Sequence, residues 1–205
     1  MASTKTLYLS VALAGLMIGV TGPANAGMIT SFSSSAPGNT TLAVDPGNAS
    51  YLDFTANFTS STPITFTIGV SSPGTYSLVA PDNAMTNNVT NSTGHRWKAF
   101  DTDISGGYVS AFSYSSSSPW LNLSFNSPFP FTNVHLSNGT GLFSGESMYL
   151  SPGVTVTDFS GGPATFEVTL TPTANPEPST LVLASTAMTL TGVGYWWRGR
   201  RRLPI

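Results

Sequence analysis

Apolar and polar residues alternate one by one through much of the middle of this chain, and this period of two constrains the fold more than any other feature. In residues 51–58, Leu52, Phe54, Ala56 and Phe58 alternate with more polar residues. The same pattern recurs in residues 64–70, 121–125, 132–136 and 166–170, and residues 108–114 also have the composition of a strand. Because successive side chains of a strand point to opposite faces, each segment is expected to form a strand with one face in the core.

Clusters of turn-forming residues separate these segments. They are Ser72-Pro73-Gly74, Pro81-Asp82-Asn83, Asn138-Gly139, Ser151-Pro152-Gly153 and Gly161-Gly162-Pro163. The polar residues 83–96 are predicted to form a long loop. Short strands at this spacing, without an amphipathic helical pattern, predict an all-β domain, an antiparallel β-sandwich or jelly roll, over residues 27–174.

A membrane-length apolar segment and a cluster of arginines lie at the C-terminal end. Residues 179–197 contain no charged residue, and as a helix they would span roughly 28 Å, close to the roughly 30 Å hydrocarbon core of a bilayer. Arg198, Arg200, Arg201 and Arg202 follow at once, and such a cluster marks the cytoplasmic side. We therefore predict a single transmembrane helix at about 179–197 with a basic stop at 198–202. A buried core helix is the alternative, but it leaves the arginines unexplained.

The N-terminal residues have the three parts of a secretory signal peptide. Lys5 supplies the positive charge, residues 7–20 are apolar, and Ala24 and Ala26 form a small-x-small cleavage site. The apolar run is too short to cross a membrane comfortably. Signal peptidase is expected to remove residues 1–26, so that the mature chain starts at Gly27.

The C-terminal motif Pro176-Glu177-Pro178-Ser179, with the apolar segment and the arginines behind it, resembles a PEP-CTERM sorting domain. The resemblance covers residues 175–205 and is accompanied, as is usual in that family, by an N-terminal signal peptide. It implies recognition by an exosortase while the precursor is transiently anchored in the inner membrane. It also implies export to the cell surface or extracellular matrix of a Gram-negative bacterium that makes exopolysaccharide. A GPI signal is the nearest rival, but its tail ends apolar rather than in arginines.

The region between the two ends is acidic and contains no cysteine. Eight acidic residues accompany only two basic ones, Arg96 and Lys98, between residues 27 and 174. Nucleic acids are bound through basic surfaces, so we expect no nucleic-acid partner. Because no disulfide can form, packing and backbone pairing must stabilise the exported domain.

One acidic stretch has the spacing of half a calcium-binding loop. Asp101, Asp103 and Ser105 precede a glycine as in the first half of an EF-hand, where oxygen ligands occupy alternate positions. The position of the final carboxylate is Phe112, so an acid distant in sequence would have to complete the site. The candidates are Asp82, Glu146 and Asp158. Calcium is therefore a candidate cofactor, and the alternative is an acidic turn that leads into a strand.

Catalytic motifs are missing from the sequence, which predicts that the protein is not an enzyme. There is no His-Glu-x-x-His pattern, no Gly-x-Ser-x-Gly elbow and no phosphate loop. His135 falls on the polar face of its predicted strand and is expected at the surface. A glycosidase carboxylate pair could assemble in space, but the scattered acids give no indication of one.

Two functions fit these observations. The first is a structural protein of an exopolysaccharide-rich envelope or biofilm, displayed through the sorting tail. The alternative is a carbohydrate-binding module, or a hydrolase, acting on the same polymer. In that case Trp97 and Trp120, with Tyr108 and Tyr114, would form an exposed platform on which sugar rings stack. Buried aromatic side chains would instead favour the structural protein.

Overall fold

The computed structural model describes residues 27–81, 86–116, 120–126, 128–157 and 164–174. The chain divides into two units, Met1–Ala174 and Asn175–Ile205, and every described residue belongs to the first. The predicted signal peptide, with Ala24 and Ala26, lies outside the described residues, as does the whole predicted sorting tail. No helix in the described ranges is long and apolar enough to cross a bilayer.

The described residues form twelve strands and no helix, which confirms the predicted all-β domain. The strands are β1 Ile29–Ser34, β2 Thr40–Val44, β3 Tyr51–Phe58, β4 Ile64–Val70, β5 Gly74–Val79, β6 Val89–Asn91, β7 Trp97–Ser105, β8 Tyr108–Ser116, β9 Trp120–Phe125, β10 Asn133–Leu142, β11 Ser147–Val156 and β12 Ala164–Ala174. Each segment that was expected to be a strand corresponds to one of these. The alternation succeeds as a predictor because burying one face of a strand fixes which residues point inward.

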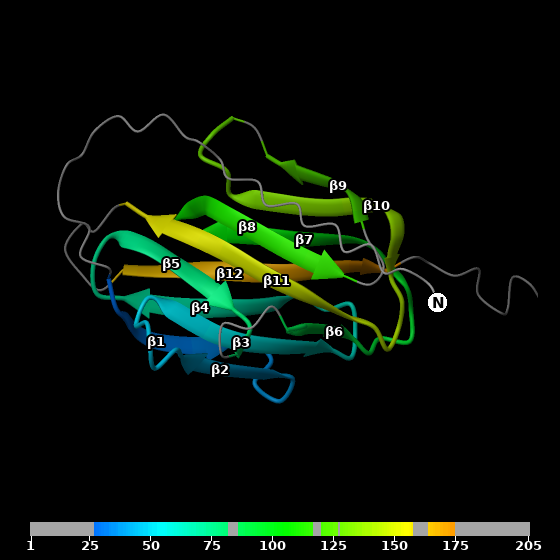
Figure 1. The fold of residues 1–205 in the computed structure, drawn as a ribbon, viewed down its shortest axis with the longest axis horizontal. Coiled ribbons are helices and arrows are strands. Elements are labelled where there is room, and N and C mark those ends of the chain that lie inside the picture. The colour runs from blue at the N-terminus through cyan, green and yellow to red at the C-terminus, as the bar shows by residue number, and fades with distance from the viewer. Residues whose placement is uncertain (1–26, 82–85, 117–119, 127, 158–163, 175–205) are drawn as a thin grey trace, which may run out of the picture. The chain divides into compact units, whose positions relative to one another are not determined.

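The strands pair into two mainly antiparallel sheets (Figure 1). Sheet A has the order β1-β4-β12-β7-β10-β9. Sheet B begins with β2 and β3 and ends with β11 and β8. The short strands β5 and β6 both lie between β3 and β11, one after the other. Strand β5 pairs with the first part of β3 and the last part of β11. Strand β6 pairs with the last part of β3 and the first part of β11. Only the pairings of β3 with β5 and β6 are parallel.

A single hydrophobic core lies between the two sheets. Rings from opposite sheets meet there. Phe54 of β3 lies 5.4 Å from Phe66 of β4, between ring centroids, and Phe58 of β3 lies 5.2 Å from Trp97 of β7. All four side chains are buried. The described residues thus form a sandwich-like arrangement, and apolar burial is its main source of stability.

Two of the predicted turns lie inside strands instead. Asn138 and Gly139 belong to β10, where both residues have positive φ angles of 58° and 81°. The pairing of β10 with β7 shifts register between Ser137 and Leu142. Asparagine and glycine tolerate the left-handed conformation, and here they use it in a bulge rather than in a hairpin turn.

The second misplaced turn is Ser151-Pro152-Gly153, which lies within β11. Proline has no N–H to donate to a neighbouring strand and is usually excluded from central strands. Here, however, the pairing of β11 with β5 begins only at Gly153, and its pairing with β6 ends at Met148. The proline therefore sits opposite the gap between β5 and β6, where no ladder bond is lost.

The predicted loop over residues 83–96 is interrupted by a short strand. Strand β6 covers Val89–Asn91, and the side chains of Val89 and Asn91 are buried. Residues 82–85 lie outside the described ranges. Two buried positions in a polar stretch are too few to produce a recognisable alternation, so the sequence did not indicate this strand.

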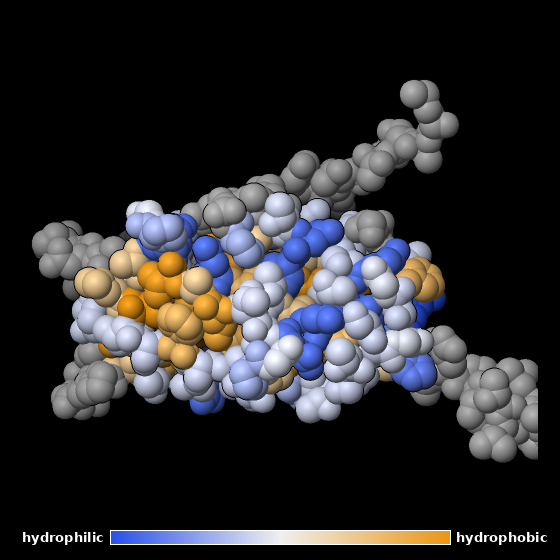
Figure 2. All heavy atoms as spheres, turned by 90° about the horizontal axis from the view of Figure 1, so that it is seen from below, coloured by the Kyte–Doolittle hydropathy of each residue, from blue (hydrophilic) through white to orange (hydrophobic). Residues whose placement is uncertain are grey.

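Figure 2 shows apolar side chains gathered over part of the face seen from below, where the edge strands β1 and β2 lie. Met28, next to β1, and Phe32, within β1, are exposed. Leu42 and Val44 of β2 are half-buried and pack against the core. This face therefore exposes some apolar area beside the edge strands.

Candidate functional site

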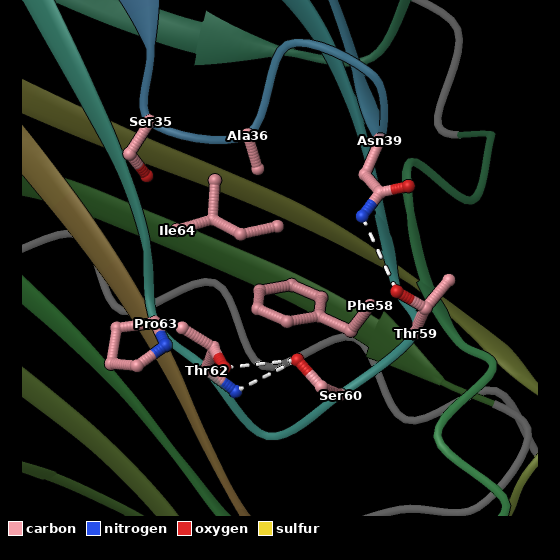
Figure 3. Close-up of a pocket in the computed structure, with 9 residues that line it drawn as sticks. All are labelled: Ser35, Ala36, Asn39, Phe58, Thr59, Ser60, Thr62, Pro63 and Ile64. Atoms are coloured by element: carbon pink, nitrogen blue, oxygen red, sulfur yellow. Dashed lines mark hydrogen bonds between the residues drawn. The ribbon is translucent and has the colours of Figure 1, made fainter.

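A small pocket opens between two loops at one end of the sandwich (Figure 3). One loop connects β1 to β2 and the other connects β3 to β4. The pocket has a volume of about 190 Å³. Its lining consists of Ser35, Ala36, Asn39, Phe58, Thr59, Ser60, Thr62, Pro63 and Ile64.

The pocket combines an apolar floor with a rim of neutral hydrogen-bonding groups. Phe58 and Ile64 are buried core residues. On the rim, Asn39 Nδ2 donates to Thr59 Oγ1 at 3.3 Å, and Ser60 Oγ donates to Thr62 Oγ1 at 3.0 Å. No lining residue is ionisable at neutral pH, so the pocket suits a small neutral group and offers neither a general acid nor a carboxylate ligand.

The three residues of the predicted calcium site lie on β7, in a strand rather than in a loop. Asp101, Asp103 and Ser105 alternate with buried residues and therefore share the outer face of sheet A. Alternate residues of a strand are separated by roughly 6.5–7 Å along its axis. A calcium-binding loop instead curls its ligands around the ion. The glycine turn begins only at Gly106, with a φ angle of 74°.

Both aspartates already have partners across the sheet. Asp101 Oδ1 lies 2.6 Å from His135 Nδ1 of β10, and Asp103 Oδ1 accepts a hydrogen bond of 2.7 Å from Asn133 Nδ2. The structure therefore brings Asp101 together with His135. Within the described ranges, no three His, Cys, Asp or Glu side chains gather as a metal site. Asp82 and Asp158 lie outside those ranges. Calcium binding remains a prediction.

An open groove runs beside the His135–Asp101 pair on the outer face of sheet A. It is lined by Lys98, Ala99, His135, Ser137, Asn138, Gly139 and Thr173. The His135 side chain is 38% exposed, in agreement with its expected position on the polar face. A lysine, an imidazole and several hydroxyl and amide groups make this groove able to bind polar ligands by hydrogen bonding.

The predicted tryptophan platform is wrong, because both tryptophans belong to the core. Trp97 is 0% exposed and Trp120 is 1% exposed. Phe100 lies between them, with ring centroids 5.6 Å from Trp97 and 6.3 Å from Trp120. Tyr114 is half-buried, and its hydroxyl donates to the Trp120 carbonyl at 2.9 Å. Burial raises the pKa of the Tyr114 phenol above its ordinary value.

A different group of aromatic side chains reaches the surface, and no pattern in the sequence indicates that they come together. We call Tyr108, Phe125, Phe129 and Phe131 the aromatic cluster. The ring centroids of Phe129 lie 5.4 Å from Tyr108 and 5.6 Å from Phe131, and those of Phe125 and Phe131 lie 5.3 Å apart. Phe129 is 59% exposed. The available signal was the Phe-Pro-Phe sequence in a connection between strands, where large apolar residues are unusual.

Phe129 and Phe131 lie in the connection between β9 and β10, and hydrogen bonds hold this connection near both of its ends. Asn126 Oδ1 accepts hydrogen bonds from the backbone N–H groups of Thr132 and Asn133, at 2.8 and 2.9 Å. Farther along, Ile104 N of β7 donates to the Thr132 carbonyl, and Val109 N of β8 donates to the Phe131 carbonyl, both at 2.7 Å. The connection is thus bonded to both sheets, which holds the aromatic cluster in place.

Comparisons with known proteins identify no relative. No protein-family model matches the chain, and neither a curated protein nor a solved structure matches it.

Proposed function

We propose that this protein is an exported structural component of a bacterial cell surface or extracellular matrix, sorted by an exosortase-type system. The observation that carries the proposal is the order of signals at the C-terminus. Pro176-Glu177-Pro178-Ser179 comes first, followed by the apolar residues 179–197 and then the arginine cluster. A cleavable signal peptide at the other end completes the arrangement.

The proposed route needs two separable properties of the tail. The arginines stop translocation, because placing each one in hydrocarbon costs about 2.5–3.5 kcal/mol on insertion scales. Glu177 lies before the apolar segment and belongs to the motif that the exosortase would read. The precursor is then held in the inner membrane until the sorting enzyme acts on it.

The domain between the signals has a surface suited to a hydrated, polymer-rich layer. Hydroxyl groups pair across its strands on the outward faces: Thr65 with Thr169 at 3.0 Å, and Thr75 with Thr155 at 2.9 Å. These side chains provide polarity without charge. The aromatic core and the absence of cysteine are consistent with a domain that needs no disulfide outside the cell.

Fractionation of cells that express tail variants tests this proposal. Replacing Arg198, Arg200, Arg201 and Arg202 with glutamine should give untethered secreted protein. Glu177→Ala should leave the membrane stop intact and strand the protein in the inner membrane. Glu167→Ala is the matched control, because Glu167 is an exposed glutamate of β12 that lies outside the sorting motif and the apolar segment. If both tail variants reach the surface like the unmodified chain, the sorting proposal is wrong.

Carbohydrate binding is the second candidate function. Trp97 and Trp120 cannot stack against a sugar, because both side chains are buried. The exposed aromatic cluster provides a new basis, since aromatic rings pack against the apolar faces of sugar rings. A purified chain that is retarded by polysaccharide in a native gel would support this function.

A further inference from the structure

We infer that the aromatic cluster around Phe129 is a binding site for the ring faces of a neutral glycan. This inference deepens the second candidate function and rests on it. Its starting point is the exposure of Phe129, because a phenylalanine that is 59% exposed and touches two other rings leaves apolar area in water, at a cost in free energy that a bound ring face would remove. A function that uses the exposed ring accounts for that cost.

The cluster is organised in advance of any ligand. The Phe129 ring stands nearly perpendicular to Phe131, with an interplanar angle of 87°, and at 70° to Tyr108. Phe131 is half-buried and packs against the core, so the exposed ring is supported from beneath. The hydrogen bonds of Asn126 fix the backbone that follows. A pre-positioned ring loses little conformational entropy when a ligand stacks on it.

Polar groups that suit sugar hydroxyls lie at the start of β10, which follows the aromatic cluster closely along the chain, and at the paired position of β7. Asn133 donates to Asp103 through Nδ2, and it follows Phe131 by two residues. In the described part of the chain, Asn133 Oδ1 and Asp103 Oδ2 have no hydrogen-bond partner. Both can accept hydrogen bonds from hydroxyl groups. An exposed aromatic ring, with a neutral acceptor a few residues along the chain and an acidic acceptor paired with it, matches a pyranose, which has C–H groups on its faces and hydroxyl groups at its edge.

Charge argues against a membrane surface and against an acidic polymer. The only basic residues between residues 27 and 174 are Arg96 and Lys98, near the start of β7. Asp103 lies five residues beyond Lys98, or about 16 Å along an extended strand. Anionic lipids and acidic glycans are held by clustered lysine and arginine. The charged residue paired with Asn133, two residues beyond Phe131, is the acidic Asp103 instead, which leaves neutral glycans as the fitting class.

The exposed area is too small for a stable contact between two copies of this chain. A phenylalanine side chain offers about 150–250 Å², so the exposed part of Phe129, at 59%, corresponds to roughly 90–150 Å². A stable protein–protein interface buries about 800 Å² on each partner. One sugar ring needs far less surface than that.

Affinity electrophoresis of the full chain tests the inference directly. The chain is purified in a detergent without a sugar headgroup and run in native gels that contain hydroxyethyl cellulose, galactomannan or dextran. At least one of these neutral polymers should retard it. Phe129→Ala should weaken that binding about tenfold or more, as expected for the loss of one stacked ring. Phe129→Trp should retain it.

Phe143→Ala is the matched control. Phe143 is 44% exposed and follows the opposite end of β10 from Phe131, so its removal should leave binding unchanged. If Phe129→Ala still binds the polymer as the unmodified chain does, the proposed site is wrong and the sugar binds elsewhere on the protein. No retardation of the unmodified chain by any polymer overturns the site and the sugar-binding function together. A dimer that Phe129→Ala converts to monomers, with glycan binding unchanged, would identify a contact between copies instead. Because the protein is purified, none of these results depends on how the tail is sorted.

Discussion

Asn88→Ala should destabilise the domain strongly, because the Asn88 side chain makes two backbone hydrogen bonds to β11 at a position where neither β5 nor β6 pairs with that strand. It lies just before β6, where β5 and β6 leave a gap opposite β11. Asn88 Nδ2 donates to the Leu150 carbonyl and Leu150 N donates to Asn88 Oδ1, both at 2.8 Å. Asn88 is only 2% exposed and Leu150 is fully buried. The side chain therefore satisfies the two backbone groups of Leu150 that an adjacent strand would otherwise pair with.

The magnitude follows from those two groups. Each buried backbone group left without a partner costs about 1–3 kcal/mol, so Asn88→Ala should lower the free energy of unfolding by about 2–6 kcal/mol. A domain of this size is stable by only about 5–15 kcal/mol. The midpoint of thermal unfolding should fall by about 2–4 °C for each kcal/mol lost.

Denaturant titration of the full chain, followed by circular dichroism of the strands, measures this change. Asn87→Ala is the matched control, since Asn87 is the neighbouring asparagine and is exposed. The slope of the free energy against denaturant should stay the same in both variants, because the folded and unfolded surfaces are unchanged. If Asn88→Ala lies within about 0.5 kcal/mol of Asn87→Ala, the bridging role of Asn88 is refuted.

Two further predictions concern the metal and the signal peptide. If Asp101, Asp103 and Ser105 hold calcium, millimolar calcium should raise the melting temperature of the chain, and Asp103→Ala should abolish the increase. If calcium raises the melting temperature of Asp103→Ala by the same amount, or does not raise that of the unmodified chain, these residues do not form a calcium site. Replacing Ala26 with a bulky residue such as phenylalanine should block signal peptidase and leave a longer precursor, visible on an immunoblot. Processing at the normal rate would place the cleavage site elsewhere.

Strands were predictable from the sequence wherever burial of one face imposes alternation, as at Leu52, Phe54 and Phe58. The exceptions are places where a side chain or a bulge replaces regular pairing. Pro152 has the residue type of a turn, and the sequence does not indicate that it would lie opposite the gap between β5 and β6. That gap exists only in the folded sheet, where both strands pair with β11. Asn138 has a residue type typical of turns, and its left-handed conformation is used inside β10.

The candidate sites were less predictable than the fold, for related reasons. The spacing of Asp101 and Asp103 is typical of a calcium loop, yet it is also the spacing of any two residues on one face of a strand. Trp97 and Trp120 each stand at the first residue of a strand, where sequence alone does not decide between the core and the rim. Phe129 lies in a connection, outside any periodic pattern, so its contacts with Tyr108 become visible only in three dimensions.

Mass spectrometry of the protein recovered from the cell surface tests the central claim of export and sorting most directly. It reads the N-terminus of the mature chain, and the proposal predicts that this terminus is Gly27, the residue after the Ala24-Asn25-Ala26 site. The N-terminal peptide should therefore begin Gly27-Met28-Ile29. A surface protein that still begins at Met1 or Ala2 would contradict export through a cleaved signal peptide.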